Sequence, residues 1–446
     1  MSTTPPPRRG RLLAVGAVGA VVLLAAGSGA LAGRALDGGE ETTPNRTAEG
    51  TPPTARSVIF INGDGMAATH REAARLDQEG FDGRLAMDSL PVTGLQSTDP
   101  HDPEETVTDS AAGASAWTIG EKTYNGAISV DTEGNPLPTL GAEAAAAGRA
   151  TGLVTTAQVT DATPAAFFSS SPTRSEQADI AGQYLADTKP SVILGGGEDW
   201  WLPAGSPGAY PDAPADDPDE GSRGTSGDLI TQAQQQGYEY VRNGAELETA
   251  DGDKLLGLFA NQEMFQQRAE GQGDEFDPAV PLADMTAKAL DVLSRDEDGF
   301  LLVIEEEAVD EMSHANNGVR MLEAMRSLDA AVAVARDYVA EHPDTLLVVT
   351  GDHECGGLTI EDVDAEDESG PGGTSPDGPG SGATESGEDG PFAVAGSDKT
   401  FVLDWTTTSH TGVPTPVTAE GPGSEQLAGS YPNTHVHEVL RAALTS

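Results

Sequence analysis

The segment Val58–Met66 reads VIFINGDGM, an apolar run followed by two glycines that flank an acid. An apolar run bounded by glycine predicts a short strand that is buried on both faces of a sheet. Asp64 would then stand at the carboxyl end of the strand, where open α/β sheets bind their ligands. Taken by itself, the segment is explained more simply as a plain turn, so the rest of the chain has to decide.

The same combination recurs further along the chain. Three other apolar runs end in glycine or acidic residues: 192–194 before Gly195, 300–304 before Glu305, and 345–350 before Gly351. Residues 285–293 and 319–340 repeat apolar side chains at helical spacing. Strands that alternate with helices indicate an α/β fold.

The composition limits the classes of function. The 446 residues carry 73 acidic and 24 basic side chains, a formal net charge of −49. Because a nucleic-acid-binding surface needs clustered basic residues, we expect no nucleic-acid binding. The acidity suits solubility in salty surroundings, although a compositional habit of the lineage explains it equally well. Cys355 is the sole cysteine, so no disulfide can form within the chain.

Residues 1–32 have the pattern of a secretory signal peptide. Three arginines, Arg8, Arg9 and Arg11, precede the apolar run 12–26, and Ala30-Leu31-Ala32 has the form of a cleavage site. The Arg8-Arg9 pair resembles a twin-arginine signal. We therefore expect a secreted or cell-surface protein without stable membrane association after cleavage. An uncleaved anchor is the alternative, because residues 12–33 carry no charge and could just span a bilayer.

Two further segments lack the features of a folded core. Residues 33–55 are polar and rich in Thr, Pro and Gly, which predicts a flexible linker before a folded part at 56–446. Residues 361–397 contain Gly, Pro, Ser, Asp and Glu with almost nothing apolar. Such a stretch cannot bury enough surface to offset its ordering entropy, so we expect a disordered acidic insert. The fold resumes at 401–403 and ends in a helix at about 436–444.

Ser110 is the candidate nucleophile. It follows Asp109 and opens an alanine-rich run that reaches Trp117, which predicts a helix beginning there. A helix N-terminus offers unpaired N–H groups and partial positive charge, so an anion fits beside the serine. The simpler explanation is that Asp109 or Ser110 is a plain N-cap.

Several acids and histidines follow the predicted strands at the spacing of metal ligands. Asp310 and His314 are four residues apart and share one helix face. Such a pair is more often a surface pair, but the chain also offers Asp64, Asp352, His353 and His410. Carboxylates and imidazoles are ligands that zinc accepts, and these residues suffice for two zinc ions with three ligands each. Glu305 and Thr163 are oxygen donors that suit magnesium.

Taken together, these motifs resemble those of the bacterial alkaline phosphatases. The matching segments occur in the family's order, from about residue 57 to the C-terminus except for the acidic insert: 61–66, 108–112, 122–126, 161–165, 305–314, 351–354 and 410–412. The resemblance implies an alkaline-phosphatase-like catalytic domain over 56–446. Its fold would be a three-layer α/β sandwich, with a large central, mostly parallel sheet flanked by helices. Homodimers are frequent in this family, but the sequence identifies no interface.

The resemblance also assigns roles. Ser110 would be the nucleophile, forming a covalent phosphoserine, and Arg174 would bind two phosphate oxygens. One zinc would be held by Asp310, His314 and His410, and the other by Asp64, Asp352 and His353. Magnesium would be bound by Asp64, Thr163 and Glu305, and by Asp161 through water.

Three positions depart from the family pattern. Glu311 stands where the family commonly has lysine or histidine, and Glu306 and Glu307 replace small residues. The leading hypothesis is a secreted phosphatase that hydrolyses small phosphate monoesters with two Zn²⁺ and one Mg²⁺. A relative that prefers phosphodiesters is the second hypothesis, because Glu311 disfavours a dianion. An inactive, metal-stabilised binding protein at the cell surface is the third.

Overall fold

A ten-stranded sheet forms the centre of the computed structural model, which describes residues 55–210, 221–266, 274–362, 374–375, 378–379 and 387–445. The strands lie in the order β17 (Gly429–Pro432), β2 (Val92–Ser97), β16 (Thr415–Glu420), β8 (Thr345–Thr350), β1 (Ser57–Gly63), β7 (Phe300–Glu306), β3 (Ala150–Gln158), β4 (Val192–Gly196), β6 (Leu255–Leu258) and β5 (Glu239–Val241). The seven strands from β8 to β5 are parallel. Only β16 runs antiparallel to its neighbours β8 and β2. The predicted mostly parallel sheet is confirmed.

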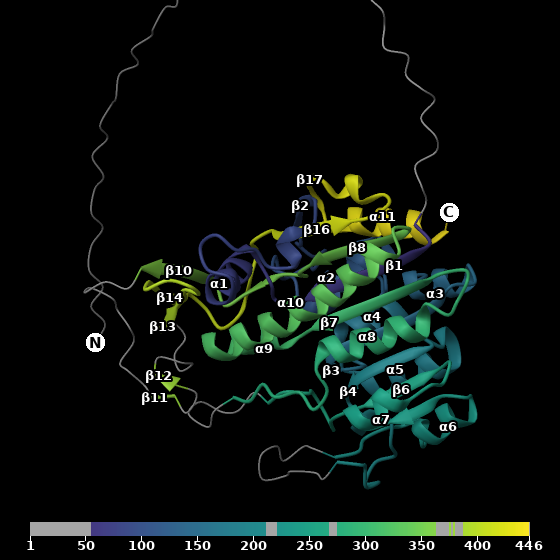
Figure 1. Ribbon diagram of the computed structural model, residues 1–446. Helices are drawn as coiled ribbons and strands as arrows, with labels where there is room; N and C mark the ends of the chain where they lie inside the picture. The colour runs from purple at the N-terminus through teal and green to yellow at the C-terminus, as the bar shows by residue number, and fades with distance from the viewer. Residues whose placement is uncertain are drawn as a thin grey trace, which may run out of the picture. The chain divides into compact units, whose positions relative to one another are not determined.

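Helices cover both faces of this sheet (Figure 1). On one face lie α1 (Ala68–Gln78), α7 (Gly244–Thr249), α8 (Leu282–Leu293), α9 (Ala308–His314) and α10 (Gly318–Glu341). On the other lie α2 (Ser110–Ile119), α3 (Leu140–Ala146), α4 (Ala162–Phe168), α5 (Gln177–Gln183), α6 (Leu229–Gln235) and α11 (Thr434–Thr445). Short 3₁₀ or π turns occupy Met87–Ser89, Tyr184–Thr188, Glu198–Trp200 and Ser424–Leu427. The predicted three layers are therefore present.

The apolar run that opens β1 serves both layers. Ile59 and Ile61 belong to the core beneath α8 and α10, whereas Val58 and Phe60 belong to the core beneath α2 and α11. This follows from the alternation of side chains along a strand. Burying each of these side chains contributes about 1.5–3 kcal/mol to stability. The strand is buried over its whole length, as its sequence predicts.

The described residues also form three smaller sheets. β10 (Leu358–Asp362), β14 (Thr400–Trp405) and β13 (Gly387–Ala393) form an antiparallel sheet, and β9 (Glu354–Cys355) pairs with β15 (His410–Thr411). The remaining pair is β11 (Thr374–Ser375) with β12 (Gly378–Pro379). No helix among the described residues is both long and apolar enough to cross a membrane.

The predicted disorder of 361–397 is wrong at its two ends. Residues 361–362 end β10, and 387–397 contribute β13 and the turn after it. Phe392 packs against Phe401, and the buried Asp389 accepts hydrogen bonds from Gly318 N (2.5 Å) and Trp405 Nε1 (3.2 Å). The average composition of the stretch conceals these anchors. The rest of the predicted insert lies outside the described residues, as do the predicted signal peptide and, except for Ala55, the predicted linker.

Candidate active site

Four neighbouring parallel strands, β8, β1, β7 and β3, deliver the candidate residues to one edge of the sheet. Because the strands are parallel, their carboxyl ends meet at that edge. Asp352 and His353 follow β8, and Asp64 follows β1. Glu305 lies in β7 itself, with Asp310 and His314 on the short helix α9 behind it. Asp161 is the N-cap of α4, after β3, and its side chain accepts a hydrogen bond from Ala162 N.

Ser110 is the first residue of α2, and its hydroxyl points into the site. Its Oγ lies 3.2 Å from His353 Nε2 and 3.4 Å from Asp64 Oδ1. The capping role belongs instead to Asp109, whose carboxylate accepts a hydrogen bond from Ala112 N at 2.9 Å. The plain N-cap that the simpler explanation proposed is therefore present, but it is Asp109 and not Ser110. It is a buried hydroxyl at a helix N-terminus, beside a histidine and a carboxylate.

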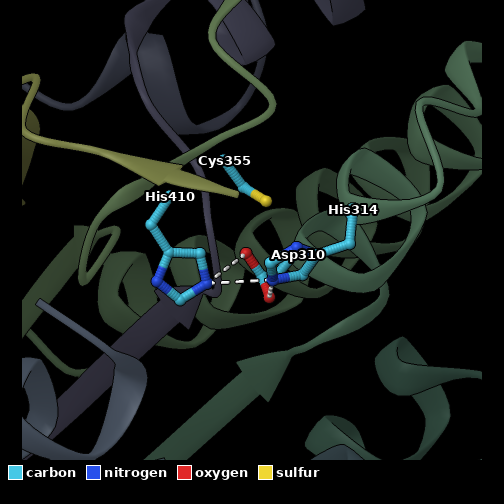
Figure 2. A group of neighbouring side chains, drawn as sticks. All are labelled: Asp310, His314, Cys355 and His410. Carbon is cyan, nitrogen blue, oxygen red and sulfur yellow. Dashed lines mark hydrogen bonds and ion pairs between the residues drawn. The ribbon is translucent and has the colours of Figure 1, made fainter. Parts of the chain in front are cut away.

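Asp310, His314 and His410 form the first group of candidate metal ligands (Figure 2). His314 Nε2 lies 3.1 Å from Asp310 Oδ2 and 3.0 Å from His410 Nε2. The Nδ1 atoms of the two rings face backbone carbonyls, that of Thr408 at 2.6 Å and that of Thr108 at 2.9 Å. Since a carbonyl accepts only from an N–H, Nδ1 of each ring carries a proton, and Nε2 of a neutral ring would present its lone pair to Asp310. Burial lowers the pKa of His314, but Asp310 more than compensates and raises it to about 9, so a cation would have to displace the proton on Nε2. Lone pairs and a carboxylate that converge in this way are suited to a cation.

Asp64, Asp310 and His353 form a second group, which Asp352 joins. His353 Nε2 lies 3.2 Å from Asp352 Oδ2 and 3.4 Å from Asp64 Oδ1, while Nδ1 lies 3.7 Å from Asp310 Oδ1. Among the described residues, Asp310 Oδ1, Asp352 Oδ2 and His353 Nδ1 are buried without a hydrogen-bond partner. Buried polar atoms are costly unless they are paired or bind a metal.

The shifted pKa values of Asp64, Asp352 and His353 also reflect the cost of burying charged groups. Burial, followed by Asp352 and Asp310, raises the pKa of Asp64 well above its usual value. Burial and Asp310 raise the pKa of Asp352 to about 7. Burial and His410 hold the pKa of His353 well below its usual value. Divalent cations would keep the acids ionised and the imidazole neutral, so the donor set fits two such ions.

The remaining candidates offer only oxygen. Glu305 Oε2 accepts a hydrogen bond from Thr155 Oγ1 at 2.7 Å, and Thr163 Oγ1 accepts one from Asn62 Nδ2 at 3.2 Å. Burial raises the pKa of Glu305 to about 8, although Thr155 and Thr163 oppose that shift. Carboxylate and hydroxyl oxygens fit a hard cation. No sequence pattern singled out Thr155.

Arg174 lies between two carboxylates. Its Nη2 contacts Asp161 Oδ1 at 2.7 Å, and its Nη1 contacts Asp109 Oδ2 at 3.5 Å. Burial lowers the pKa of the guanidinium, but Asp161 and Asp109 more than compensate and raise it. The arginine is thus fixed beside the helix that begins at Ser110, with further N–H donors available to an anion.

Glu311 and Cys355 also lie near the candidate metal ligands. Burial, followed by Asp310, raises the pKa of the half-buried Glu311 to about 7, so this side chain does not project freely into solvent. Cys355, which the sequence marked only as unable to form a disulfide, lies beside Asp310, His314 and His410. Like Thr155, it is a site residue that sequence reasoning missed, and the one available signal was its position two residues after His353.

The chain resembles several known proteins in sequence and in fold. The family model described as alkaline phosphatase matches residues 55–372. A streptomycin-6-phosphate phosphatase from Streptomyces griseus is 35% identical over 88% of this chain and 91% of its own. The cold-active alkaline phosphatase of a psychrophilic Shewanella is 29% identical, with a TM-score of 0.68 over 87% of this chain and all of its own. A variant of the TAB5 alkaline phosphatase, with Mg bound in its M3 site, is 24% identical, with a TM-score of 0.67 over 89% and 99% of the two chains.

Proposed function

Because the chain belongs to the alkaline phosphatase family and is a phosphatase, we propose that it hydrolyses small phosphate monoesters through a phosphoserine on Ser110. The single observation that carries this proposal is the position of Ser110 Oγ. It lies between Asp64 and His353 at the start of α2, with Arg174 beside the same helix end. A nucleophile beside a cationic anion-binding group is the arrangement that phosphoryl transfer needs.

The donor atoms of each group of residues decide which metal ion we assign to it. Asp310, His314 and His410 would hold one Zn²⁺, and Asp64, Asp352 and His353 the other. Glu305 and Thr163 would hold Mg²⁺ together with Asp64, and Asp161 would reach it through water. When bound, the ions lower the pKa of hydroxyl and water ligands and stabilise charge on the entering and leaving oxygens.

The chain's own groups then perform two displacements. Ser110 Oγ forms a bond to phosphorus as its hydroxyl proton leaves, and the bond to the departing alcohol oxygen breaks. Arg174 binds two phosphate oxygens, while Asp161 and Asp109 fix the orientation of its guanidinium. Water then attacks the phosphoserine, which breaks the Oγ–P bond and releases inorganic phosphate.

Trapping the covalent intermediate tests this proposal. At low pH, radiolabelled phosphate should attach stoichiometrically to Ser110, as located by peptide mass spectrometry. Ser110→Ala should lose the label and keep its bound metals. Ser115→Ala, on the same helix with its hydroxyl bonded to Ala127 O, is the control that should keep both. Labelling of another residue in the wild type would refute the assignment.

Two alternatives are separated by one pair of substrates. A phosphodiesterase would hydrolyse the bis-ester of p-nitrophenyl phosphate faster than the monoester. A metal-stabilised binding protein would hydrolyse neither. The buried position of Ser110 against two candidate ligands favours an enzyme over the binding protein.

An acidic cavity beside the site favours one class of alcohol. It has a volume of about 690 Å³, and its lining includes Asp102, Glu104 and Glu105. Asn125, also in the lining, accepts a hydrogen bond from the backbone N–H of Asp109, next to Ser110. Such a cavity suits phosphate esters that carry cationic groups, because acids concentrate cations locally. The name of the Streptomyces griseus relative agrees, since streptomycin carries two guanidinium groups.

Competing substrates test this second proposal. The kcat/KM for streptomycin 6-phosphate should exceed that for p-nitrophenyl phosphate and fall more steeply with salt. Glu104→Gln should lower the first value several-fold and leave the second unchanged. Glu121→Gln removes an exposed acid outside the cavity lining and is the matched control. Equal salt dependence for both substrates would contradict the proposal.

The proposed function also includes export of the protein from the cytoplasm. The arginines and the apolar run within residues 1–32 support a cleaved signal peptide and a protein that acts outside the cytoplasm. Mass spectrometry of the mature protein should find a new N-terminus close to residue 33. An intact N-terminus in the membrane fraction would favour the uncleaved anchor instead.

A further inference from the structure

Cys355 is held rigidly on the edge of the candidate metal centre. It lies in β9, directly opposite His410 of β15 in the register of that pair. Its backbone N–H donates to Gly65 O at 3.2 Å, which ties it to the turn that carries Asp64. The side chain is fully buried. These contacts leave the thiol little freedom to move away from its neighbours.

The thiol faces the three residues of the first candidate metal group. Figure 2 shows the sulfur of Cys355 directed toward Asp310 and His314. The Sγ atom, a nitrogen of each of the two histidines and a carboxylate oxygen of Asp310 all lie within 4.8 Å of one another. Asp310 Oδ1 is buried without a hydrogen-bond partner among the described residues, and so marks an open ligand position.

The four donor types together match zinc. Structural and catalytic zinc sites combine thiolate, imidazole and carboxylate ligands at about 2.0–2.3 Å in tetrahedral geometry. Softer thiolate ligands favour zinc over magnesium, calcium and manganese, which prefer oxygen. The charges also balance, because one thiolate and one carboxylate neutralise a divalent cation in a buried site.

We propose that Cys355 Sγ is a fourth protein ligand of the cation held by Asp310, His314 and His410, and that it makes this position selective for zinc. The inference rests on the metal-dependent function proposed above. Binding forms an S–metal bond and releases the thiol proton to solvent, one proton for each cation bound. Zinc can expand to five ligands, so a phosphate oxygen could bind while the thiolate stays in place.

Cobalt substitution tests the ligand directly. The metal-free protein would be loaded with Co²⁺, whose bond to a thiolate absorbs in the near ultraviolet. Since Cys355 is the sole cysteine, any such band belongs to it. The band should be present in the wild type and absent in Cys355→Ser. Near-ultraviolet spectra that are identical in the two proteins would overturn the proposal.

Metal affinity supplies a second measurement. The alternative role for Cys355 is an S–H donor to Asp310, which a serine hydroxyl would preserve and alanine would not. Changing a group that only supports a metal ligand costs about 10–100-fold in affinity. If Cys355 is a ligand, Cys355→Ser and Cys355→Ala should both lose at least tenfold in zinc affinity and leave Mn²⁺ affinity nearly unchanged. Wild-type zinc affinity in Cys355→Ser, with loss only in Cys355→Ala, would assign the donor role.

The outcomes separate this inference from the proposed function. A phosphoserine on Ser110 without a thiolate band would refute only the role of Cys355. A thiolate band without a phosphoserine would refute only the proposed mechanism.

Discussion

The two halves of the candidate site, which meet at Asp64, differ in the atoms that they offer. One half directs imidazole nitrogens from His314, His353 and His410 toward Asp310. The other half, around Glu305 and Thr163, offers only oxygen. Both halves are buried, and burial raises the pKa of carboxyl groups in each, Asp352 to about 7 and Glu305 to about 8. Burial and charge are therefore shared, and it is the donor chemistry that distinguishes the ion each half would hold.

The largest effect is expected from changing Asp310, the carboxylate that all three histidines of the first half contact. Asp310 lies 3.1 Å from His314, 3.5 Å from His410 and 3.7 Å from His353. Asp310→Asn should lower kcat by more than about 100-fold, because changes that only support a metal ligand already cost 10–100-fold. Elemental analysis should find less zinc and unchanged magnesium. A variant that keeps both zinc ions and most of its activity would show that the two halves are wrongly divided.

The oxygen half should respond differently and less severely. Glu305→Gln keeps one oxygen donor at a position that suits magnesium, so activity should fall only about tenfold, less than for Asp310→Asn. Millimolar magnesium should restore part of the activity, whereas zinc should not. Zinc content should remain that of the wild type. Rescue by zinc in place of magnesium would reverse the assignment of the two halves.

The sequence predicted those candidate site residues that lie at the end of a strand. Apolar runs that stop at an acid or glycine located β1, β7 and β8 and therefore the edge that carries Asp64, Glu305 and Asp352. The spacing of Asp310 and His314 on one helix is local and was equally readable. Resemblance to a family supplied the roles, which spacing alone does not give.

What the sequence did not predict depends on contacts across the fold. Thr155 contacts Glu305 only because β3 lies beside β7. Cys355 reaches the histidines only because β9 pairs with β15. Residues 387–393 become a strand because β14 offers it an edge, despite a composition typical of disorder. Partners far apart in the chain decide each case.

Glu311 follows Asp310 on α9, and changing it tests whether this side chain faces the bound phosphate. Two unit charges about 6–7 Å apart interact by about 2–3 kcal/mol at an effective dielectric of 20, and water and cations reduce this to about 1 kcal/mol. At pH 9, well above the pKa of about 7, Glu311 is ionised, so Glu311→Lys should tighten inhibition by inorganic phosphate several-fold and slow product release. Glu341→Lys, at the exposed end of α10, is the control for net charge. Equal inhibition constants in the wild type and Glu311→Lys would mean that Glu311 does not face the phosphate.

The finest comparison is between the consecutive residues Glu305 and Glu306 of β7. Side chains alternate along a strand, so Glu306 points away from the site, where Thr156 Oγ1 donates to it at 2.6 Å. Burial raises the pKa of Glu306 to about 7, from a usual value of 4.5, although Thr156 and Ser327 oppose the shift. Between those two pH values the folded protein keeps a proton that the unfolded chain releases, so stability falls as pH rises.

Glu306→Gln removes this dependence without removing the acceptor that Thr156 needs. The two proteins should be equally stable near pH 4, where Glu306 is protonated in both the folded and the unfolded state. By pH 8 the variant should be more stable by up to about 3 kcal/mol, the value of a shift of about 2.5 pKa units. Urea unfolding at both pH values measures this difference. Metal content should not change, since the side chain faces away from the ligands. A loss of magnesium in Glu306→Gln, like that expected in Glu305→Gln, would mean that the two glutamates share one site and that the oxygen half extends through the sheet.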